Sequence, residues 1–395
     1  MPKKPKDKLK IAMLGHKRIP SREGGVEIVV EQLSTRMTGL GHSVTCYNRK
    51  GHHVSGADFD TAITKEYKGV RLKNVWTLDK KGLAAMTSSF SAAVLAAFGK
   101  YDVVHFHAEG PCAMLWFTKL FRKKCIATIH GLDHQRAKWG KFASWYIRFG
   151  ERCAAHFADE VIVLSKNVQN YFMEKYGRET VFIPNGVTAP NTENAEIITD
   201  LYSLNRDSYI LYLGRLVPEK GVEYLIDAFA ETQTDKKLVI AGGSSDTAEY
   251  EKLLKLKAEK DSRIIFTGFV EGKTLDELYS NAYIYVLPSD LEGMPLSLLE
   301  AMSYGNCCLT SDIEECASVI EEYGITFRKG DINDLKSKLQ MLCDNTDTVN
   351  KFKSQASEYI SQKYNWDDVT SKTLALYGVP AAAMEEKQNE SIAHK

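Results

Sequence analysis

The chain has 395 residues, of which 44% are hydrophobic and 26% charged, and its 51 Lys and Arg residues balance 51 Asp and Glu residues. A chain of this length is too long for one ordinary hydrophobic core, so we expect two domains of comparable size. The zero net charge gives no field that would favour a nucleic acid as the partner.

The amino-terminal residues 1–8 are basic, but the apolar segment after them is too short for the core of a signal peptide. The longest uncharged run, 82–99, is rich in Ala and Ser, whereas a membrane-spanning helix needs about 20 strongly apolar residues. We therefore expect a cytoplasmic protein without a transmembrane anchor, in which 82–99 forms a buried or partly buried helix.

The eight cysteines mostly fall within predicted strands and helices and lack the spacing of metal ligands. This pattern indicates small buried hydrophobic residues in a reducing compartment. They are Cys46, Cys112, Cys125, Cys153, Cys307, Cys308, Cys316 and Cys343.

In the first half of the chain, short apolar segments that predict strands alternate with helical patterns. This alternation is typical of a parallel, doubly wound sheet, and it defines a first domain at 1–190, followed by a polar linker at 191–205. The predicted strands are 10–14, 43–47, 70–75, 103–106, 125–129, 160–164 and 181–183.

The second half repeats the pattern and predicts a second Rossmann-like domain at 206–363. Two such domains facing each other would place a ligand site at the carboxyl ends of their strands, in a cleft. A helix is expected at 364–379, and 380–395, rich in Ala, Glu, Gln and Lys, is expected to be disordered. The predicted strands are 209–213, 238–241, 264–267, 283–287, 307–310 and 325–327.

The loop after the first strand contains Gly24 and Gly25 at the start of a predicted helix. Without side chains, the backbone there can approach a ligand closely, although an ordinary flexible turn explains the two glycines equally well. The loop has no G-x-G-x-x-G pattern, which argues against a dinucleotide cofactor.

Three histidines lie near the ends of first-domain strands. Strand alternation places His105 and His107 on one face, where local hydrogen bonds would explain them. His130 instead ends a strand beside Gly131, where a side chain can reach a ligand site.

The segment 136–153 carries two adjacent helical stripes. The simple interpretation is that an apolar stripe faces the core and a basic stripe is its solvated flank. The alternative is that the basic stripe, with an exposed Trp, binds anionic lipid headgroups or a lipid-diphosphate acceptor. The apolar stripe is Trp139, Phe142, Tyr146, Phe149 and Cys153; the basic stripe is Lys138, Lys141, Trp145, Arg148 and Arg152.

In the second domain, Arg215 and Lys220 follow the strand at 209–213. A guanidinium fork and an ammonium group can together neutralise a diphosphate, although two solvated loop cations are the alternative. Phe269 and Val270 follow the strand at 264–267. A nucleobase could stack on Phe269, and core packing explains this Phe equally well.

The segment 287–302 runs from a buried strand through a short loop into a helix predicted to begin at Pro295. The unpaired N–H groups of a helix N-terminus suit a phosphate. Glu292 in the loop and Glu300 in the helix are separated by roughly the span of a diphosphate, at about 1.5 Å per residue. One carboxylate can hold a sugar hydroxyl and the other a ribose hydroxyl; the alternative is two solvated carboxylates.

Glu292 and Glu300 match the E-x7-E motif of retaining GT-B glycosyltransferases of family 4, which the chain resembles from about residue 10 to 377. Gly214-Arg215 and Lys220 match the Gly-Arg and Lys that the family places after the first strand of its second domain. The resemblance implies a GT-B fold whose C-terminal helix crosses back to the first domain. It also implies transfer of a sugar from a nucleoside diphosphate to an acceptor hydroxyl with retention of configuration.

The family resemblance also assigns roles to individual residues. Arg215, Lys220 and the amides of Gly24 and Gly25 would hold the leaving diphosphate, which helps to deprotonate the acceptor. Glu292 would position the sugar, Glu300 the ribose, and His130 the reacting face. The donor site would further include Gly293, Met294, Pro295, Leu296, Phe269 and Val270.

No cofactor or metal is implied, because GT-B enzymes usually use protein cations at the diphosphate. Asp58 and Asp60 match a D-x-D pattern, but they lie in a polar loop, and we do not expect them to bind a metal.

The segments 18–25 and 130–136 resemble bacterial rhamnosyltransferases of surface polysaccharide assembly, although the usual Tyr-Gly-Gly-Phe-Glu loop is here Glu23-Gly24-Gly25-Val26-Glu27. The resemblance suggests dTDP-rhamnose or a UDP-hexose as donor and a lipid-linked glycan as acceptor, with the protein peripheral on the inner face of the plasma membrane. Two alternatives remain: a GT-B sugar-nucleotide epimerase, whose signature residues are not matched, and a non-catalytic nucleotide-sugar sensor. A sensor has less need of residues that stabilise a leaving diphosphate.

Overall fold

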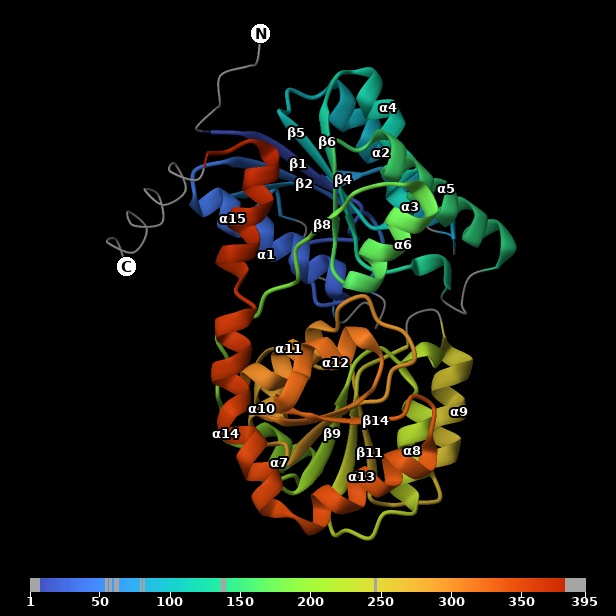
Figure 1. The fold of residues 1–395 in the computed structure, drawn as a ribbon, viewed down its shortest axis with the longest axis vertical. Coiled ribbons are helices and arrows are strands. Elements are labelled where there is room, and N and C mark those ends of the chain that lie inside the picture. Colours follow the sequence, from blue (N-terminus) through green and yellow to red (C-terminus); the bar gives the residue numbers. More distant parts are fainter. Residues whose placement is uncertain are drawn as a thin grey trace. The chain divides into compact units, whose positions relative to one another are not determined.

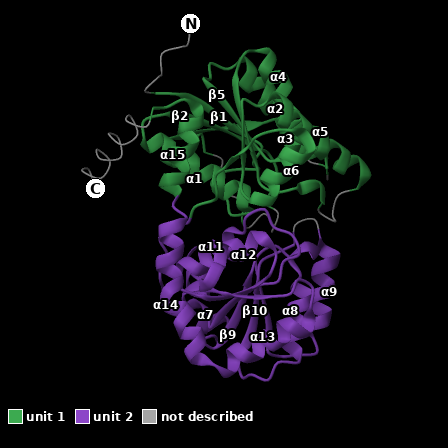
Figure 2. Ribbon diagram, in the orientation of Figure 1, with its two compact units in different colours: residues 1–186, 366–395 green, residues 187–365 purple. Residues whose placement is uncertain are grey.

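The computed structural model describes residues 8–53, 56, 59, 64–78, 80, 82–135, 140–244 and 247–380. The chain forms two compact units, one containing residues 1–186 and 366–395 and the other residues 187–365 (Figure 2). The tail expected to be disordered lies, apart from Pro380, outside the described residues.

Unit 1 is built on an eight-stranded sheet in the order β3-β4-β2-β1-β5-β6-β7-β8. All neighbouring strands are parallel except β3 and β4, so the prediction of a parallel, doubly wound sheet is confirmed. The strands are β1 (Lys10–Leu14), β2 (Ser43–Arg49), β3 (Glu66–Tyr67), β4 (Val70–Val75), β5 (Val103–His107), β6 (Lys124–Ile129), β7 (Glu160–Val163) and β8 (Val181–Phe182).

The central strands of this sheet are continuous apolar runs because helices cover both faces of a parallel sheet. Residues such as Leu14, Phe106 and Ala127 are completely buried. The helices of unit 1 are α1 (Gly25–Gly39), α2 (Leu83–Phe98), α3 (Glu109–Cys112), α4 (Leu115–Leu120), α5 (Lys141–Phe157), α6 (Lys166–Tyr176) and α15 (Trp366–Tyr377), with a short 3₁₀ turn η2 (Asp133–Gln135).

Unit 2 contains a fully parallel six-stranded sheet in the order β11-β10-β9-β12-β13-β14. Its strands are β9 (Tyr209–Leu213), β10 (Lys237–Ala241), β11 (Ile264–Gly268), β12 (Ile284–Leu287), β13 (Cys307–Ser311) and β14 (Ile325–Phe327). Its helices are α7 (Ile197–Tyr202), α8 (Val222–Ala230), α9 (Ala248–Ala258), α10 (Gly272–Asn281), α11 (Leu296–Ser303), α12 (Glu314–Ile320), α13 (Ile332–Asp344) and α14 (Thr346–Lys363), with 3₁₀ turns η3 (Pro218–Lys220) and η4 (Glu321–Tyr323).

The segment expected to be a polar linker, 191–205, contains helix α7 and belongs to unit 2. Glu277 of α10, which is completely buried, accepts hydrogen bonds from the backbone N–H groups of Glu196 and Ile198, both at 3.0 Å. These bonds satisfy the first turn of α7 and hold it against α10.

The chain returns to unit 1 through its last helix, α15, which runs beside α1 (Figure 1). Arg36 of α1 pairs with Asp367 of α15 at 2.8 Å, and Tyr377 OH lies 2.5 Å from His105 Nδ1 on β5. This helix therefore completes the covering of the first sheet.

In both sheets, the direction in which successive strands are added reverses beside the first strand. In unit 1, β1 lies between β2 and β5, and in unit 2, β9 lies between β10 and β12. Open parallel sheets bind ligands outside the carboxyl ends of the strands at such a reversal point. The loops after β1, β5, β9 and β12 are therefore where a site is expected.

The remaining predictions about composition concern the cysteines and the uncharged run. All eight cysteines are free thiols; the prediction that they are small buried residues is confirmed for seven, whereas Cys343 is only partly buried. The uncharged run forms α2, which buries Ala92, Ala93, Ala96 and Ala97 and exposes Phe90 and Phe98. Among the described residues, no helix combines the length and the apolarity that crossing a membrane requires.

Candidate active site

The reversal point of unit 2 brings the loop after β9 against the loop after β12. Gly221, with φ +62°, lies so close to the second loop that a Cβ atom here would be 2.1 Å from the carbonyl oxygen of Pro288. The N–H of Asp290 donates to the carbonyl of Glu219 at 2.9 Å, and Tyr212 OH donates to the carbonyl of Arg215 at 3.0 Å. These contacts fix the loop that carries Arg215 and Lys220.

Lys220 and Glu292, predicted from separate motifs, form an ion pair at this point. Lys220 Nζ lies 2.5 Å from Glu292 Oε1, and the two side chains are only 10% and 9% exposed. Ser289 Oγ donates to the same carboxylate oxygen at 2.6 Å. Glu292 is thus a buried, hydrogen-bonded carboxylate, and the alternative of a solvated loop residue is wrong.

Helix α11 begins directly after this loop. Its first residue is Leu296, one residue later than predicted, and Pro295 takes the N-cap position without a side chain that accepts from the first turn. Gly293, Pro295 and Leu296 are buried and Met294 is partly buried. The N-terminal amides of α11, which have no side-chain cap, give the helix end a partial positive charge beside Lys220 and Glu292.

Glu300 lies further along α11 and is partly buried. Tyr279 OH donates to Glu300 Oε2 at 3.3 Å, and the Tyr279 ring stacks on Tyr304 with ring centroids 5.2 Å apart. The carboxylate therefore lies against an aromatic pair of the same unit and is not a fully solvated helix-surface group.

Phe269 and Val270 follow β11, the edge strand of the sheet, and both are partly buried. Strand β10 separates β11 from β9. Gly242, at the end of β10 with φ +132°, would place a Cβ atom 1.9 Å from the carbonyl oxygen of Gly214. The loops after β9 and β10 therefore pack closely, and the predicted base site lies two strands away from the Lys220–Glu292 pair.

In unit 1, Gly24 is the N-cap of α1 and Gly25 its first residue, as predicted. The sequence motifs give no role to Glu23 and Glu27, and the structure buries both. Glu23 contacts Lys17 Nζ at 3.1 Å and Arg18 Nε at 3.3 Å. These contacts tie the loop after β1 to the start of α1.

Glu27 accepts a hydrogen bond from the N–H of Lys17 at 2.8 Å, and a Cβ atom on Gly24 would lie 2.9 Å from Glu27 Oε2. Burial alone would raise the pKa of Glu27, but the Lys17 charge and the backbone hydrogen bonds bring it below its usual value. A carboxylate therefore lies beside the helix start for which the sequence predicted a phosphate site.

His130 is held by a second histidine. His107 Nδ1 lies 3.2 Å from His130 Nε2, and the His107 ring stacks on His105 with centroids 4.1 Å apart, which confirms that His105 and His107 share one face. His105 is satisfied locally by Tyr377 OH and by Thr128 Oγ1 at 2.7 Å. Burial lowers the pKa of His105 to about 3 and that of His107 well below its usual value, so both rings are neutral near pH 7.

The buried face of helix α5 differs from the one that the simplest interpretation of its sequence predicts. The apolar stripe was expected to face the core, but Phe142 is 63% exposed and Phe149 39% exposed. At its contact with α3 the helix has a glycine, because a Cβ atom on Gly150 would lie 2.0 Å from the carbonyl oxygen of Glu109. The buried residues of α5 are Ile147, Gly150, Glu151, Cys153, Ala154 and Ala155. Large side chains cannot fit at this contact. Of the predicted apolar stripe, Phe142 and Phe149 therefore face outward, whereas Tyr146 is partly buried and Cys153 is buried.

The outward face of α5 is both aromatic and basic. Trp145, which is 61% exposed, stacks on Phe142 and Phe149 with ring centroids 5.9 and 6.1 Å apart. Lys141, Arg148 and Arg152 are exposed as predicted, and Lys138 and Trp139 lie outside the described residues. Next to this face is an open apolar groove of about 410 Å³, lined by Trp116, Lys119, Leu120, Phe149, Cys153 and Phe157.

The D-x-D pattern stays untested, because Asp58 and Asp60 lie outside the described residues.

Comparison with known proteins assigns both halves of the chain to related families. Residues 23–189 match the Glycosyltransferase Family 4 profile, and residues 195–359 match the profile of the Glycosyl transferases group 1. An uncharacterized glycosyltransferase of Methanocaldococcus jannaschii is 24% identical over 405 residues, covering 95% of this chain and all of the relative. The phosphatidyl-myo-inositol mannosyltransferase of Mycobacterium leprae is 25% identical over 298 residues, covering 73% of this chain and 76% of the relative.

Among solved structures, HepE of Anabaena in complex with UDP and glucose superposes with a TM-score of 0.77 at 16% identity, covering 94% of this chain and all of the other. This structural similarity shows the fold, and the two consecutive family matches show that the chain is a glycosyltransferase. The chain is a glycosyltransferase of family 4, group 1, with the GT-B fold.

Proposed function

We propose that the chain is a retaining hexosyltransferase that takes its sugar from a nucleoside diphosphate and passes it to a glycan acceptor at an anionic membrane surface. The observation that carries the proposal is the buried Lys220–Glu292 pair at the reversal point of unit 2, directly before the N-terminus of α11.

The donor side of the proposal rests on charge. Lys220 and Arg215 supply cations, and the uncapped end of α11 supplies backbone amides, so a diphosphate meets compensating positive charge without a metal. HepE, which shares the fold, was solved with UDP and glucose, and this supports a nucleoside-diphosphate sugar as the ligand class. The donor is dTDP-rhamnose or a UDP-hexose.

In the transfer step, the bond between the anomeric carbon and the diphosphate oxygen breaks, and a bond from the same carbon to the acceptor oxygen forms on the same face. The acceptor proton goes to the departing diphosphate. Lys220 and Arg215 stabilise the charge that develops on this leaving group. Glu292, already ordered by Ser289 and Lys220, holds a sugar hydroxyl, and Glu300 holds the ribose.

His130, a residue of unit 1, takes part in the transfer, and His107 orients the His130 ring. A neutral His107 can donate or accept at its Nδ1, so the hydrogen bond to His130 Nε2 persists whichever ring carries the proton. Substitution of His107 should therefore affect turnover more than donor affinity.

The acceptor side of the proposal rests on the outward face of α5 and the adjoining groove. Exposed aromatic rings with flanking Lys and Arg residues are typical of surfaces that enter the headgroup region of a bilayer. There the rings lie at the boundary between water and acyl chains, and the cations pair with anionic lipid headgroups. The mannosyltransferase of Mycobacterium leprae, whose name gives a phosphatidylinositol as its acceptor, supports a lipid-linked acceptor for this chain.

The first experiment incubates the purified full chain with a panel of nucleotide sugars, with and without lipid-linked glycan acceptors, and measures nucleotide release and product. We expect release with at least one donor and its loss in Lys220→Gln. Control variant Lys351→Gln, which changes an exposed cation of the same unit, should behave as wild type. Release that is unaffected by Lys220→Gln would contradict the assignment of the donor site.

The second experiment tests the membrane surface with sedimentation of vesicles that contain anionic phospholipid. Replacing Lys138, Lys141, Arg148 and Arg152 with Gln should release the protein, because each cation near the surface contributes about 1 kcal/mol, and salt should screen this attraction. The control replaces four exposed cations of unit 2, Lys252, Lys260, Lys329 and Lys351, and changes the net charge equally. Equal sedimentation of the two variants would contradict the proposal, whereas donor binding should be unchanged in both.

A further inference from the structure

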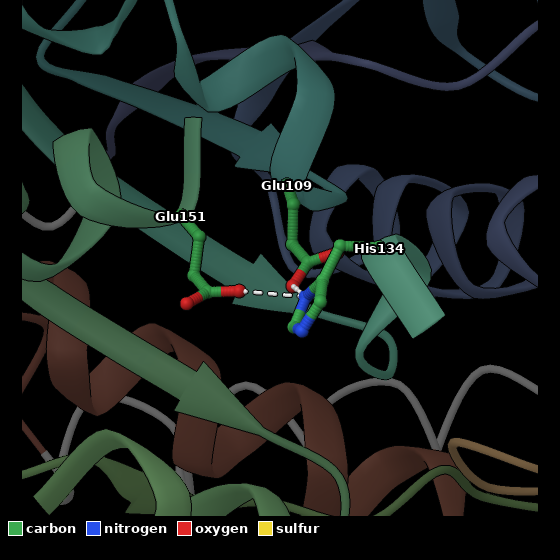
Figure 3. Close-up of side chains that lie close together, drawn as sticks. All are labelled: Glu109, His134 and Glu151. Carbon is green, nitrogen blue, oxygen red and sulfur yellow. Dashed lines mark ion pairs between the residues drawn. The ribbon is translucent and has the colours of Figure 1, made fainter. Parts of the chain in front are cut away.

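A second group of titratable side chains in unit 1 is not used by the proposed transfer. Glu109 begins α3 after β5, His134 lies in η2 after β6, and Glu151 lies on α5. The three side chains, from three separate elements, point toward one another (Figure 3). His134 Nδ1 lies 3.1 Å from Glu151 Oε2 and 3.9 Å from Glu109 Oε1, and one ligand atom from each residue lies within 4.8 Å of the others.

The outer oxygens of both carboxylates are already bound. Glu109 Oε2 accepts from the N–H of Asp133 at 2.7 Å. Glu151 Oε1 accepts from Tyr171 OH at 2.8 Å, Lys175 Nζ at 3.0 Å and Tyr176 OH at 2.5 Å. Metal-binding carboxylates are typically oriented in this way by partners on the side away from the ion.

The atoms that face the centre of the cluster lack such hydrogen bonds from outside it. Glu109 Oε1, Glu151 Oε2 and His134 Nδ1 are all buried, and apart from the ion pairs with His134 they have no hydrogen-bond partner among the described residues. The side chains of Glu109 and Glu151 are fully buried, and that of His134 is 6% exposed. Buried polar atoms are normally hydrogen-bonded, and three that converge on one point and contact only one another form an arrangement that a shared ligand would satisfy.

The charges around the cluster point to a cation. Two buried carboxylates, those of Glu109 and Glu151, meet at the cluster. Lys175 contacts only the outer oxygen of Glu151. No lysine or arginine contact is found at the two inner oxygens among the described residues.

We infer that Glu109 Oε1, His134 Nδ1 and Glu151 Oε2 bind a divalent transition-metal cation, with Zn²⁺ as the best fit. One imidazole nitrogen and two carboxylate oxygens form a ligand set that Zn²⁺ accepts, whereas Mg²⁺ and Ca²⁺ prefer oxygen alone. Zinc bonds of about 2.0–2.1 Å in a tetrahedron place ligands roughly 3.3 Å apart. His134 Nδ1 lies 3.1 and 3.9 Å from the two carboxylate oxygens, which lie within 4.8 Å of each other, so the ligands would draw together around the ion.

The ion would have a structural role. It joins the segment that follows His130 to α3 and α5, so it would hold this loop in place without touching the reacting atoms. The site was not expected from the sequence, which gave no metal, and it is separate from the charge compensation proposed at the diphosphate. Its test therefore does not depend on transferase activity.

The competing occupant of the cluster is a proton. The two carboxylates raise the pKa of His134 to about 9, so a protonated imidazole could compensate their charge when no metal is present. Glu109→Gln and His134→Gln each remove one proposed ligand. His156→Gln is the matched control, because His156 is exposed on the same helix as Glu151.

The experiment titrates the chelator-treated full chain with Zn²⁺ by calorimetry. We expect one saturable site in the wild type and in His156→Gln, and at least tenfold weaker binding in Glu109→Gln and His134→Gln. The site should also take Co²⁺, with the visible absorption of a cobalt ion bound by nitrogen and oxygen ligands, and this measurement needs only wild-type protein. No saturable binding to the wild type, or equal binding to all four proteins, would overturn the inference, as would an NMR titration of His134 unchanged by stoichiometric Zn²⁺.

Discussion

Replacing Glu292 with Gln should strengthen the binding of UDP. The same change should lower the free energy of unfolding and abolish sugar transfer. Glu292 neutralises Lys220 at 2.5 Å, so a diphosphate that binds Lys220 must approach a largely buried carboxylate. Unit charges about 6 Å apart repel by about 3 kcal/mol at an effective dielectric constant of about 20. Removal of the charge should therefore improve UDP affinity by about 1–3 kcal/mol, or about 5- to 150-fold.

The same substitution should lower the stability of unit 2. Gln can still accept from Ser289 Oγ and Lys220 Nζ, but the buried ammonium loses its counter-ion. Hydrogen bonds to charged groups contribute about 1.5–3 kcal/mol, so we expect the free energy of unfolding to fall by about 1–3 kcal/mol.

Calorimetric titration with UDP and urea unfolding measure these two effects on one protein. Glu314→Gln is the control, because it removes an exposed carboxylate from the first turn of α12 in the same unit and should leave both quantities unchanged. A folded Glu292→Gln variant that binds UDP no more tightly than wild type would refute the idea that Glu292 and the diphosphate compete for Lys220.

Three other predictions concern the ribose, the metal and pH. Glu300→Ala should weaken UDP binding by about 1–3 kcal/mol, because a buried ribose hydroxyl loses its acceptor; unchanged affinity by calorimetry would remove Glu300 from the site. Turnover of chelator-treated protein should not rise when Mg²⁺ or Mn²⁺ is added, because Arg215 and Lys220 already compensate the diphosphate; a several-fold rise would show that a metal does so. Burial lowers the pKa of His16 from 6.5 to about 4. As the pH falls below 6.5, His16 is therefore protonated in the unfolded chain before it is protonated in the folded chain. Between pH 6.5 and 5, wild type should lose about 1.6 kcal/mol of unfolding free energy more than His16→Gln, and equal losses in urea unfolding would contradict this.

The strands could be predicted because each is an apolar run between turn residues, as at Tyr209–Leu213, whose boundaries agree with the prediction. The two-residue strand Glu66–Tyr67 was missed, because it is too short to show an alternation and exists only through its antiparallel pairing with β4. The helix within the predicted linker, 191–205, was not expected, because polar composition does not reveal that a distant carboxylate, Glu277, accepts hydrogen bonds from its first turn.

The site was predicted only as far as local motifs reach. The sequence identifies Lys220 and Glu292 separately, but their pairing depends on β9 and β12 being neighbours, although these strands are not consecutive. The contact of His107 with His130 likewise depends on the pairing of β5 with β6. The Glu109–His134–Glu151 cluster joins three elements and has no signal in residue spacing.

The orientation of α5 shows the limit of helical periodicity. Phe142 and Phe149 have the spacing of a core stripe, yet the contact that decides their direction is the close packing of Gly150 on the backbone of Glu109. The glycine was visible in the sequence, but its partner was not. A small residue flanked by large ones on a helix is therefore as informative about the buried face as the large residues themselves.

The most direct test of the proposed reaction is the anomeric configuration of its product. With a donor that the panel shows to be used, the purified chain should transfer the sugar to its acceptor and release the nucleoside diphosphate in equal amounts. NMR coupling constants of the new linkage should then show the same anomeric configuration as in the donor. An inverted linkage, or consumption of the donor to a free sugar or a glycal without an acceptor product, would contradict the account.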